Sequence, residues 1–122
     1  MAEYFYDSYA IIEYLRGNRA FQKYFKEPRG VTTRFNLIEV YCRLLDDPDF
    51  AEEVYSSFSS VLVDPTDGQL KRAMVMRREL KGKGLNISYA DAIGYLVARD
   101  RKARFLTGDN EFKDVPHVEF VK

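Results

Sequence analysis

Two aspartates in this sequence stand directly after predicted strands. Asp7 follows a short aromatic strand over residues 3–6, and Asp109 follows Gly108 at the end of an apolar strand over residues 105–107. In an open α/β sheet, the carboxyl ends of parallel strands lie on one edge, and binding sites form there. We therefore expect both carboxylates at the same edge of a sheet.

Two further acids lie in predicted helices that can approach this edge. Asp91 falls in the first turn of a helix that should begin at Ser88, because Ser88-x-x-Asp91 has capping-box spacing. Glu39 lies in a helix over residues 34–45, at the border of its apolar side when the helix is projected at about 100° per residue. A carboxylate at that border is expected to be half-buried, with Arg43 as its evident local partner.

Four carboxylates in one pocket repel one another, and without compensation one or more of their pKa values must rise. A hard divalent cation such as Mg²⁺ or Mn²⁺ removes this conflict, since these ions favour carboxylate and water ligands. Two such ions about 4 Å apart can clamp a phosphodiester, activate a water and stabilise the leaving oxygen. The predicted reaction is phosphodiester hydrolysis, with Asp7, Glu39, Asp91 and Asp109 as metal ligands.

Several of these residues also have a purely structural interpretation. Asp7 could cap the helix that follows it, Asp91 could complete its capping box, and Asp109 could be an ordinary turn residue. Thr107 could be only a β-favouring strand residue. Taken singly, these alternatives stay open. We favour one shared site because the alternative requires several independent coincidences at one sheet edge.

The elements that must position these acids alternate along the chain. The expected strands cover residues 3–6, 31–33, 60–63, 105–107 and 118–121, and the expected helices cover residues 9–16, 20–27, 34–45, 49–57, 66–81 and a segment from 88 onward. This alternation predicts a three-layer α/β/α sandwich with a central, mostly parallel sheet of about five strands. We expect residues 1–122 to form a single domain, because this length supports one core and is too short for two.

Composition narrows the class of protein. Apolar residues make up 46% and aromatic residues 15% of the chain, which predicts a packed globular fold. Nineteen basic and nineteen acidic residues cancel, so global charge predicts no nucleic-acid partner, although local patches could bind one. One cysteine and one histidine argue against a disulfide and against a zinc or iron centre. No apolar run approaches the roughly 20 residues that cross a bilayer, and no signal-peptide pattern is present, so we expect a cytoplasmic protein without a membrane partner.

The motifs together resemble a known family. Asp7-Ser8 after an aromatic strand, Glu39 in an apolar helix, Ala90-Asp91-Ala92 opening a helix and Thr107-Gly108-Asp109-x-x-Phe112 closing a strand form a pattern that resembles the PIN domain. The chain looks most like the small VapC-type toxins of prokaryotic toxin–antitoxin pairs, and the resemblance covers nearly its whole length. Cys42-Arg43 departs from that pattern, because many of these toxins carry a small residue there.

The resemblance implies a Mg²⁺- or Mn²⁺-dependent endoribonuclease. In that family the acids matching Asp7, Glu39, Asp91 and Asp109 bind the metal, and the hydroxyl matching Thr107 assists the site. The resemblance also implies an RNA substrate, homodimers, and a cognate antitoxin whose tail occludes the acidic pocket.

Other polar residues receive a simpler interpretation. We expect Ser8 to be structural, Cys42 to be a buried small hydrophobe, His117 to be a surface loop residue, and Glu111 to be a solvated loop acid. Arg34 is the candidate for a phosphate contact near the metal ligands. The basic segment over residues 71–83 could contact phosphates too, but a solvated face that shields the sheet is the interpretation we favour.

Two other classes of function fit the same residues. A metal-binding but inactive RNA-binding or scaffold domain would carry the same acids. A receiver-type phosphoacceptor domain also has an aspartate at a strand end with acids and a threonine nearby. Receivers, however, carry an acidic pair directly after the first strand and a lysine after the last, and here only Asp7 is placed in that way.

Overall fold

A computed structural model describes residues 3–26 and 29–122, and within these ranges the chain forms one five-stranded, entirely parallel sheet. The strands are β1 (Tyr4–Tyr6), β2 (Gly30–Thr33), β3 (Leu62–Val63), β4 (Arg104–Thr107) and β5 (Val118–Phe120). They lie in the order β3-β2-β1-β4-β5. The predicted parallel sheet is confirmed.

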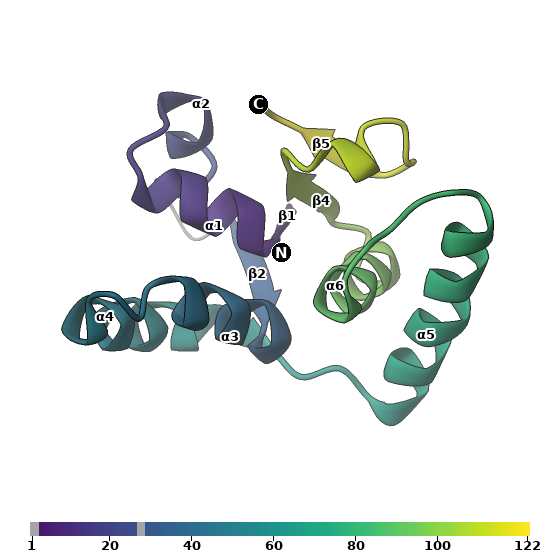
Figure 1. The fold of residues 1–122 in the computed structure, drawn as a ribbon, viewed down its shortest axis with the longest axis horizontal. Helices are drawn as coiled ribbons and strands as arrows, with labels where there is room; N and C mark the ends of the chain where they lie inside the picture. Colours follow the sequence, from purple (N-terminus) through teal and green to yellow (C-terminus); the bar gives the residue numbers. More distant parts are fainter. Residues whose placement is uncertain (1–2, 27–28) are drawn as a thin grey trace.

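Helices cover both faces of this sheet. They are α1 (Ser8–Leu15), α2 (Arg19–Gln22), α3 (Arg34–Arg43), α4 (Pro48–Phe58), α5 (Asp67–Gly82) and α6 (Tyr89–Asp100), with short 3₁₀ turns η1 (Ser59–Val61) and η2 (Asn110–Phe112). Figure 1 shows α1 to α4 on one side of the sheet and α5 and α6 on the other, which confirms the three-layer prediction. In the described ranges, no helix combines the length and apolar character that a membrane span requires.

The central strand β1 shows why both faces must be covered. Successive side chains of a strand point to opposite faces. Phe5 is fully buried on the α6 side and stacks on Phe105, with ring centroids 5.7 Å apart. Tyr6 is buried on the α1 side and stacks on Phe25 at 4.2 Å. A strand buried on both faces is a run of apolar residues without alternation, as in this sequence.

The strand order creates the place where a site can form. From β1 the sheet continues through β2 to β3 on one side and through β4 to β5 on the other. In open α/β sheets, such a change of direction leaves a crevice outside the carboxyl ends of the neighbouring strands. Asp7 follows β1 and Asp109 follows β4, so both stand at this crevice.

The apolar side of α3 differs from the predicted one. Helical spacing over residues 34–45 predicts an apolar side made of Leu37, Ile38, Tyr41, Leu44 and Leu45. Ile38 and Leu45 are instead 53% and 46% exposed, whereas Leu37, as predicted, and Val40 are fully buried. The reason is that α3 packs against both α1 and α6, and this docking rotates residues 37 and 40 toward the sheet. Periodicity had identified a helix with an apolar side but not the position of that side's centre.

Two predicted elements are shorter in the structure. The helix expected over 20–27 is helical only at Arg19–Gln22 and continues as turns, and residue 27 lies outside the described residues. The strand expected over 60–63 pairs only at Leu62–Val63, because η1 occupies the residues before it.

Candidate functional site

A cavity of about 420 Å³ lies at the carboxyl edge of the sheet, and we name it the carboxylate pocket. All four predicted metal ligands, Asp7, Glu39, Asp91 and Asp109, line it. They come from four separate segments: the start of α1, the middle of α3, the first turn of α6, and the loop after β4. The structure therefore brings together the four acids that the sequence singled out.

Asp7 serves both as a helix cap and as a wall of the pocket. Its side chain is 1% exposed, and Oδ1 accepts a 2.7 Å hydrogen bond from the Ala10 amide at the start of α1. The hydroxyl of Thr107 also hydrogen-bonds to Asp7. Thr107 in turn accepts a 3.0 Å hydrogen bond from the Asp109 amide through Oγ1. The buried Thr107 thus links two of the carboxylate-bearing residues.

The pKa values of two aspartates record their burial and mutual repulsion. Burial raises the pKa of Asp7 well above its ordinary value; the charge of Asp91 and, less strongly, that of Asp109 act in the same direction, against hydrogen bonds from Thr107 and Ala10. Burial, followed by the charges of Glu39 and Asp109, raises the pKa of Asp91 to about 7. The charges of these carboxylates repel one another, as predicted from the sequence.

Glu39 is half-buried, as predicted, and is held by Ser8, which in turn contacts Asn36; sequence reasoning placed neither residue in the site. Ser8 Oγ donates a 2.7 Å hydrogen bond to Glu39 Oε1, and it also contacts the Asn36 carbonyl at 3.2 Å. Asn36 is fully buried, and its Oδ1 accepts a 2.8 Å hydrogen bond from Thr33 Oγ1. Thr33 caps α3, so the polar contacts run from β2 through α3 to α1.

One signal for these residues was present in the sequence. Thr33-x-x-Asn36 has N-cap spacing, and Asn36 precedes Glu39 by three residues on the same helix, so the two share one side of α3. A polar residue on the buried side of a helix requires a partner, and that partner proved to be Ser8 and Thr33.

The side chain of Asp91 takes no part in capping α6. Ser88 caps α6 by accepting a 3.0 Å hydrogen bond from the Asp91 amide, which confirms the predicted helix start. The reciprocal bond of a full box is present in α5 but not in α6, both helices lying wholly within the described residues. Gly94 lets α6 lie directly on β1, because a Cβ there would stand 2.6 Å from the Phe5 ring. This close packing places the first turn of α6 beside the pocket.

Asp109 and Glu111 form the turn after β4. Asp109 is half-buried, and its Oδ1 accepts a 3.0 Å hydrogen bond from the Glu111 amide, so it is a turn residue as well as a pocket residue. Glu111 Oε2 accepts a 3.3 Å bond from the Asn86 amide and does not line the pocket. This hydrogen bond connects the turn after β4 to the loop before α6.

Two expectations near the pocket were wrong. Cys42 was expected to be buried, but it is exposed and lines the pocket, because it lies one turn beyond Glu39 on the outward side of α3. Arg34 was expected near the carboxylates, but it pairs with Asp64 at 3.5 Å and does not line the pocket. Arg43 does line it, although within the described part of the chain it forms no ion pair with Glu39.

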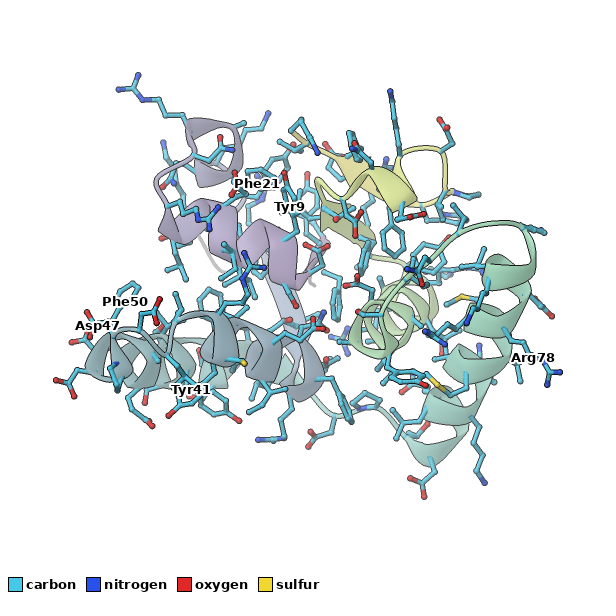
Figure 2. The ribbon with its side chains drawn as sticks, in the orientation of Figure 1. Tyr9, Phe21, Tyr41, Asp47, Phe50 and Arg78 are labelled. Carbon is cyan, nitrogen blue, oxygen red and sulfur yellow. The ribbon has the colours of Figure 1, made fainter. Side chains whose placement is uncertain are left out.

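The basic segment over residues 71–83 lies along α5, away from the pocket. Arg72 forms a bidentate ion pair with Asp100, with N–O distances of 2.9 and 3.0 Å. Arg77 donates a 2.8 Å hydrogen bond to the carbonyl of residue 87. Figure 2 shows Arg78 pointing away from the rest of the molecule. These contacts fit a structural and solvated face.

The chemistry of the pocket fits a hard divalent cation. Four carboxylates line the pocket, and carboxylates are the preferred ligands of such ions. A cation there would relieve the repulsion that contributes to the raised pKa values of Asp7 and Asp91. Among the described residues, no three acidic, histidine or cysteine side chains already stand as a preformed ligand group for one ion. The four acids share a cavity without closing a cage, an arrangement that suits an ion retaining several waters.

Comparison with known proteins places the fold. A family model described as "PIN domain" matches residues 4–118. No curated protein matches the sequence. A toxin–antitoxin complex from Klebsiella pneumoniae aligns with a TM-score of 0.73 at 18% identity, covering 98% of this chain and 96% of that chain. VapBC2 from Rickettsia felis, bound to a DNA fragment from its promoter, gives 0.73 at 18% identity, covering 98% of each chain.

A third similar structure is VapC20 of Mycobacterium tuberculosis, described as a sarcin-ricin loop cleaving toxin. It gives a TM-score of 0.75 at 16% identity, covering 98% of this chain and 99% of that chain. At such identities these structures show that the fold is shared, and the family match comes from the sequence.

Proposed function

This chain belongs to the PIN domain family, and from that premise we propose that it is a divalent-metal-dependent endoribonuclease that hydrolyses phosphodiester bonds of RNA. The observation that carries the proposal is the carboxylate pocket. Asp7, Glu39, Asp91 and Asp109 line one cavity at the crevice of the sheet, and two of them have raised pKa values. A site that gathers acids at such a cost in repulsion is expected to bind a cation.

These four carboxylates would hold Mg²⁺ or Mn²⁺. A bound hard cation would supply Lewis-acid stabilisation of the phosphodiester and would lower the pKa of a water molecule. The residues of the chain prepare the ligands: Thr107 orients Asp7 from β4, and Ser8 orients Glu39 from α1. Preorganised ligands need less rearrangement when the cation and substrate bind.

RNA is the proposed substrate on the basis of the family and of the pocket lining. Arg43 lines the carboxylate pocket, where its guanidinium could contact a phosphate oxygen. The similar VapC20 is described as cleaving the sarcin-ricin loop, and we extend only the class of substrate to this protein.

We propose further that the protein acts as a toxin with a cognate antitoxin, in the cytoplasm, as a single domain over residues 1–122. Similar folds occur in toxin–antitoxin complexes. A groove of about 510 Å³ separate from the carboxylate pocket is lined by aromatic side chains, including Tyr14, Phe25, Phe50 and Phe58. Such a groove suits apolar side chains of a partner segment.

A homodimer is also proposed. The outward side of α3 exposes Phe35 and Ile38, which are 41% and 53% accessible, and the turn after α3 exposes Leu45, which is 46% accessible. The spacing of three residues between Phe35 and Ile38 places these two on one side of the helix. We name these exposed apolar residues the stripe of α3, and exposed apolar side chains of this kind favour association with a second copy.

The nuclease proposal is tested with Asp91→Asn and Glu39→Gln. We expect each to lower the rate of RNA cleavage in Mg²⁺ or Mn²⁺ by at least about 100-fold, since even outer-shell partners of a metal account for 10- to 100-fold. Asp46→Asn, an exposed acid in the turn after α3, is the matched control. Circular dichroism checks the fold of each variant. Cleavage at the wild-type rate by both site variants, or full cleavage in EDTA, would reject the assignment.

The alternative of an inactive metal-binding scaffold predicts a different pair of results. Mn²⁺ would still raise the melting temperature, because a ligand that binds only the native state stabilises it, but no RNA would be cut.

The receiver alternative is not favoured by the fold. Receivers of the flavodoxin type have the strand order 2-1-3-4-5, whereas the order here is 3-2-1-4-5.

A further inference from the structure

A different cavity, of about 390 Å³, lies at the opposite, amino edge of the sheet. It is lined by Arg99, Lys102, Ala103, Arg104 and His117, from the end of α6 and the starts of β4 and β5. Within the described ranges, its lining holds three cationic side chains and an imidazole but no carboxylate. We name it the basic pocket.

The nearby acids leave much of this positive charge uncompensated. Asp100 is engaged by Arg72 of α5 through two hydrogen bonds. Glu119 pairs with Arg104 at 2.9 Å. The Arg99 guanidinium lies over the Tyr95 ring at 5.8 Å, and Arg99, Lys102 and His117 take part in none of the ion pairs found among the described residues.

The backbone at Lys102 is the second observation. Three helices end with one residue in the left-handed region, followed by an amide that donates to the carbonyl five residues earlier, at 3.0, 2.9 and 2.9 Å. In α1 that residue is Gly17, with φ of 84°, and in α5 it is Gly84, with φ of 90°. In α6 it is Lys102, with φ of 59°. Glycine is the favoured residue at this position, so α6 carries a lysine where the same chain twice uses glycine.

His117 repeats the pattern on the other wall. Its φ is 64°, also left-handed, and its carbonyl accepts a 3.0 Å hydrogen bond from the Phe105 amide of β4. Strained non-glycine residues persist where the surrounding structure holds them, and they cluster at functional sites. Here two of them bring nitrogen-bearing side chains to the same cavity.

We propose that the basic pocket binds a phosphate group through Arg99, Lys102 and His117. The guanidinium offers a planar fork of donors, the ammonium offers a compact charge, and the imidazole offers a ring N–H. The cavity volume falls in the range typical of small-ligand sites, about 300–1,000 Å³. The phosphate is either that of a free nucleotide or a phosphodiester of RNA. This proposal does not depend on nuclease activity.

The test measures melting temperature of the full chain in EDTA at constant ionic strength, with pyrophosphate, adenosine monophosphate or a short RNA as probe. EDTA prevents phosphate from binding through a cation in the carboxylate pocket. We expect a saturable rise in melting temperature for the wild type. Lys102→Gly should melt higher than the wild type without probe, because glycine relieves the left-handed conformation, yet bind at least about tenfold more weakly. Arg99→Gln should also weaken binding.

Arg101→Gln is the matched control, because it removes the same charge from the adjacent, exposed residue that does not line the pocket. It should bind like the wild type. Tighter binding of the nucleotide than of RNA identifies a free ligand, and tighter binding of RNA identifies its backbone. The proposal is overturned if no probe gives a saturable rise, if chloride at matched ionic strength reproduces it, or if Lys102→Gly and Arg101→Gln bind alike.

Discussion

Ser8 and Glu39 are joined across the carboxylate pocket by a 2.7 Å hydrogen bond from Ser8 Oγ to Glu39 Oε1. Ser8 is the first residue of α1 and follows Asp7 directly, so this bond fixes a carboxylate of α3 relative to a carboxylate after β1. The predicted metal ligands are therefore coupled by side chains that do not themselves need to touch an ion.

Replacing Ser8 should affect activity more than stability. Ser8→Ala removes the bond that orients Glu39, and because partners that orient metal ligands typically account for about 10- to 100-fold in activity, we expect a fall of about tenfold in kcat for RNA cleavage. Because Ser8 is only half-buried, we expect a loss of about 1 kcal/mol or less in the free energy of unfolding. Ser8→Thr retains the hydroxyl and should restore most of the rate. Equal rates for Ser8→Ala and the wild type would contradict this role.

Asp7→Asn should make the metal-free protein more stable and the enzyme inactive. Asparagine caps a helix as well as aspartate does, and the substitution removes a carboxyl group whose charged form is disfavoured by burial and by the charges of Asp91 and Asp109. The expected result at pH 8 in EDTA is a higher melting temperature, with RNA cleavage in Mn²⁺ reduced by about 100-fold or more.

The matched control for Asp7→Asn is Asp47→Asn. Asp47 caps α4 through a 3.2 Å bond from the Phe50 amide, but it is exposed and lies outside the carboxylate pocket. Its substitution should leave both melting temperature and cleavage nearly unchanged. A lower melting temperature for Asp7→Asn than for the wild type at pH 8 would show that burial and repulsion of the Asp7 carboxylate do not limit the stability of the metal-free protein.

The stability of the metal-free protein should fall as pH rises from about 4 to about 7. The pKa of Asp91 is about 7 in the folded protein and near 3.9 in an unfolded chain, so between these values the native state binds more protons. Stability is then fully present below the unfolded value and is lost as pH rises through the folded value. Urea unfolding in EDTA at pH 5 and pH 8 measures the difference, and Asp91→Asn should reduce it. An identical slope in that variant would assign the pH dependence elsewhere.

Mn²⁺ should reverse this trend. The cation needs deprotonated carboxylates, so its effect on the melting temperature should be small at pH 5 and larger at pH 8. In Glu39→Gln the increase at pH 8 should be reduced, whereas in Asp46→Asn it should be retained. A Mn²⁺ effect that is equal at both pH values would argue against binding through these carboxylates.

The location of the four acids could be predicted because each stands at a boundary that the sequence marks. Asp7 and Asp109 end apolar strands, Asp91 follows a serine cap, and Glu39 borders an apolar helix side. Parallel topology then brings strand ends and helix starts to one edge. The function of these acids stays a prediction, because the fold determines where the carboxylates lie but not which ion they bind.

The residues that were missed or misplaced depend on how helices are rotated and docked. The role of Ser8 requires α1 to face α3, which no local pattern encodes. Cys42 proved exposed and Arg34 proved paired with Asp64 because α3 turns residues 37 and 40 toward the core. Helical periodicity gives the width of an apolar side, whereas its direction is decided by the neighbouring elements.

The exposed stripe of α3 leads to a prediction about assembly. In a two-fold dimer the same patch occurs on both subunits, so one substitution places two charges in the interface. Ile38→Lys should therefore convert a dimer into a monomer in size-exclusion chromatography with light scattering, while its melting temperature as a monomer stays close to that of the wild type because Ile38 is 53% exposed. Val75→Lys, on α5 at 60% exposure, is the matched control and should remain dimeric. A wild-type protein that is monomeric at tens of micromolar, or equal effects of the two lysines, would show that this stripe does not hold two copies together.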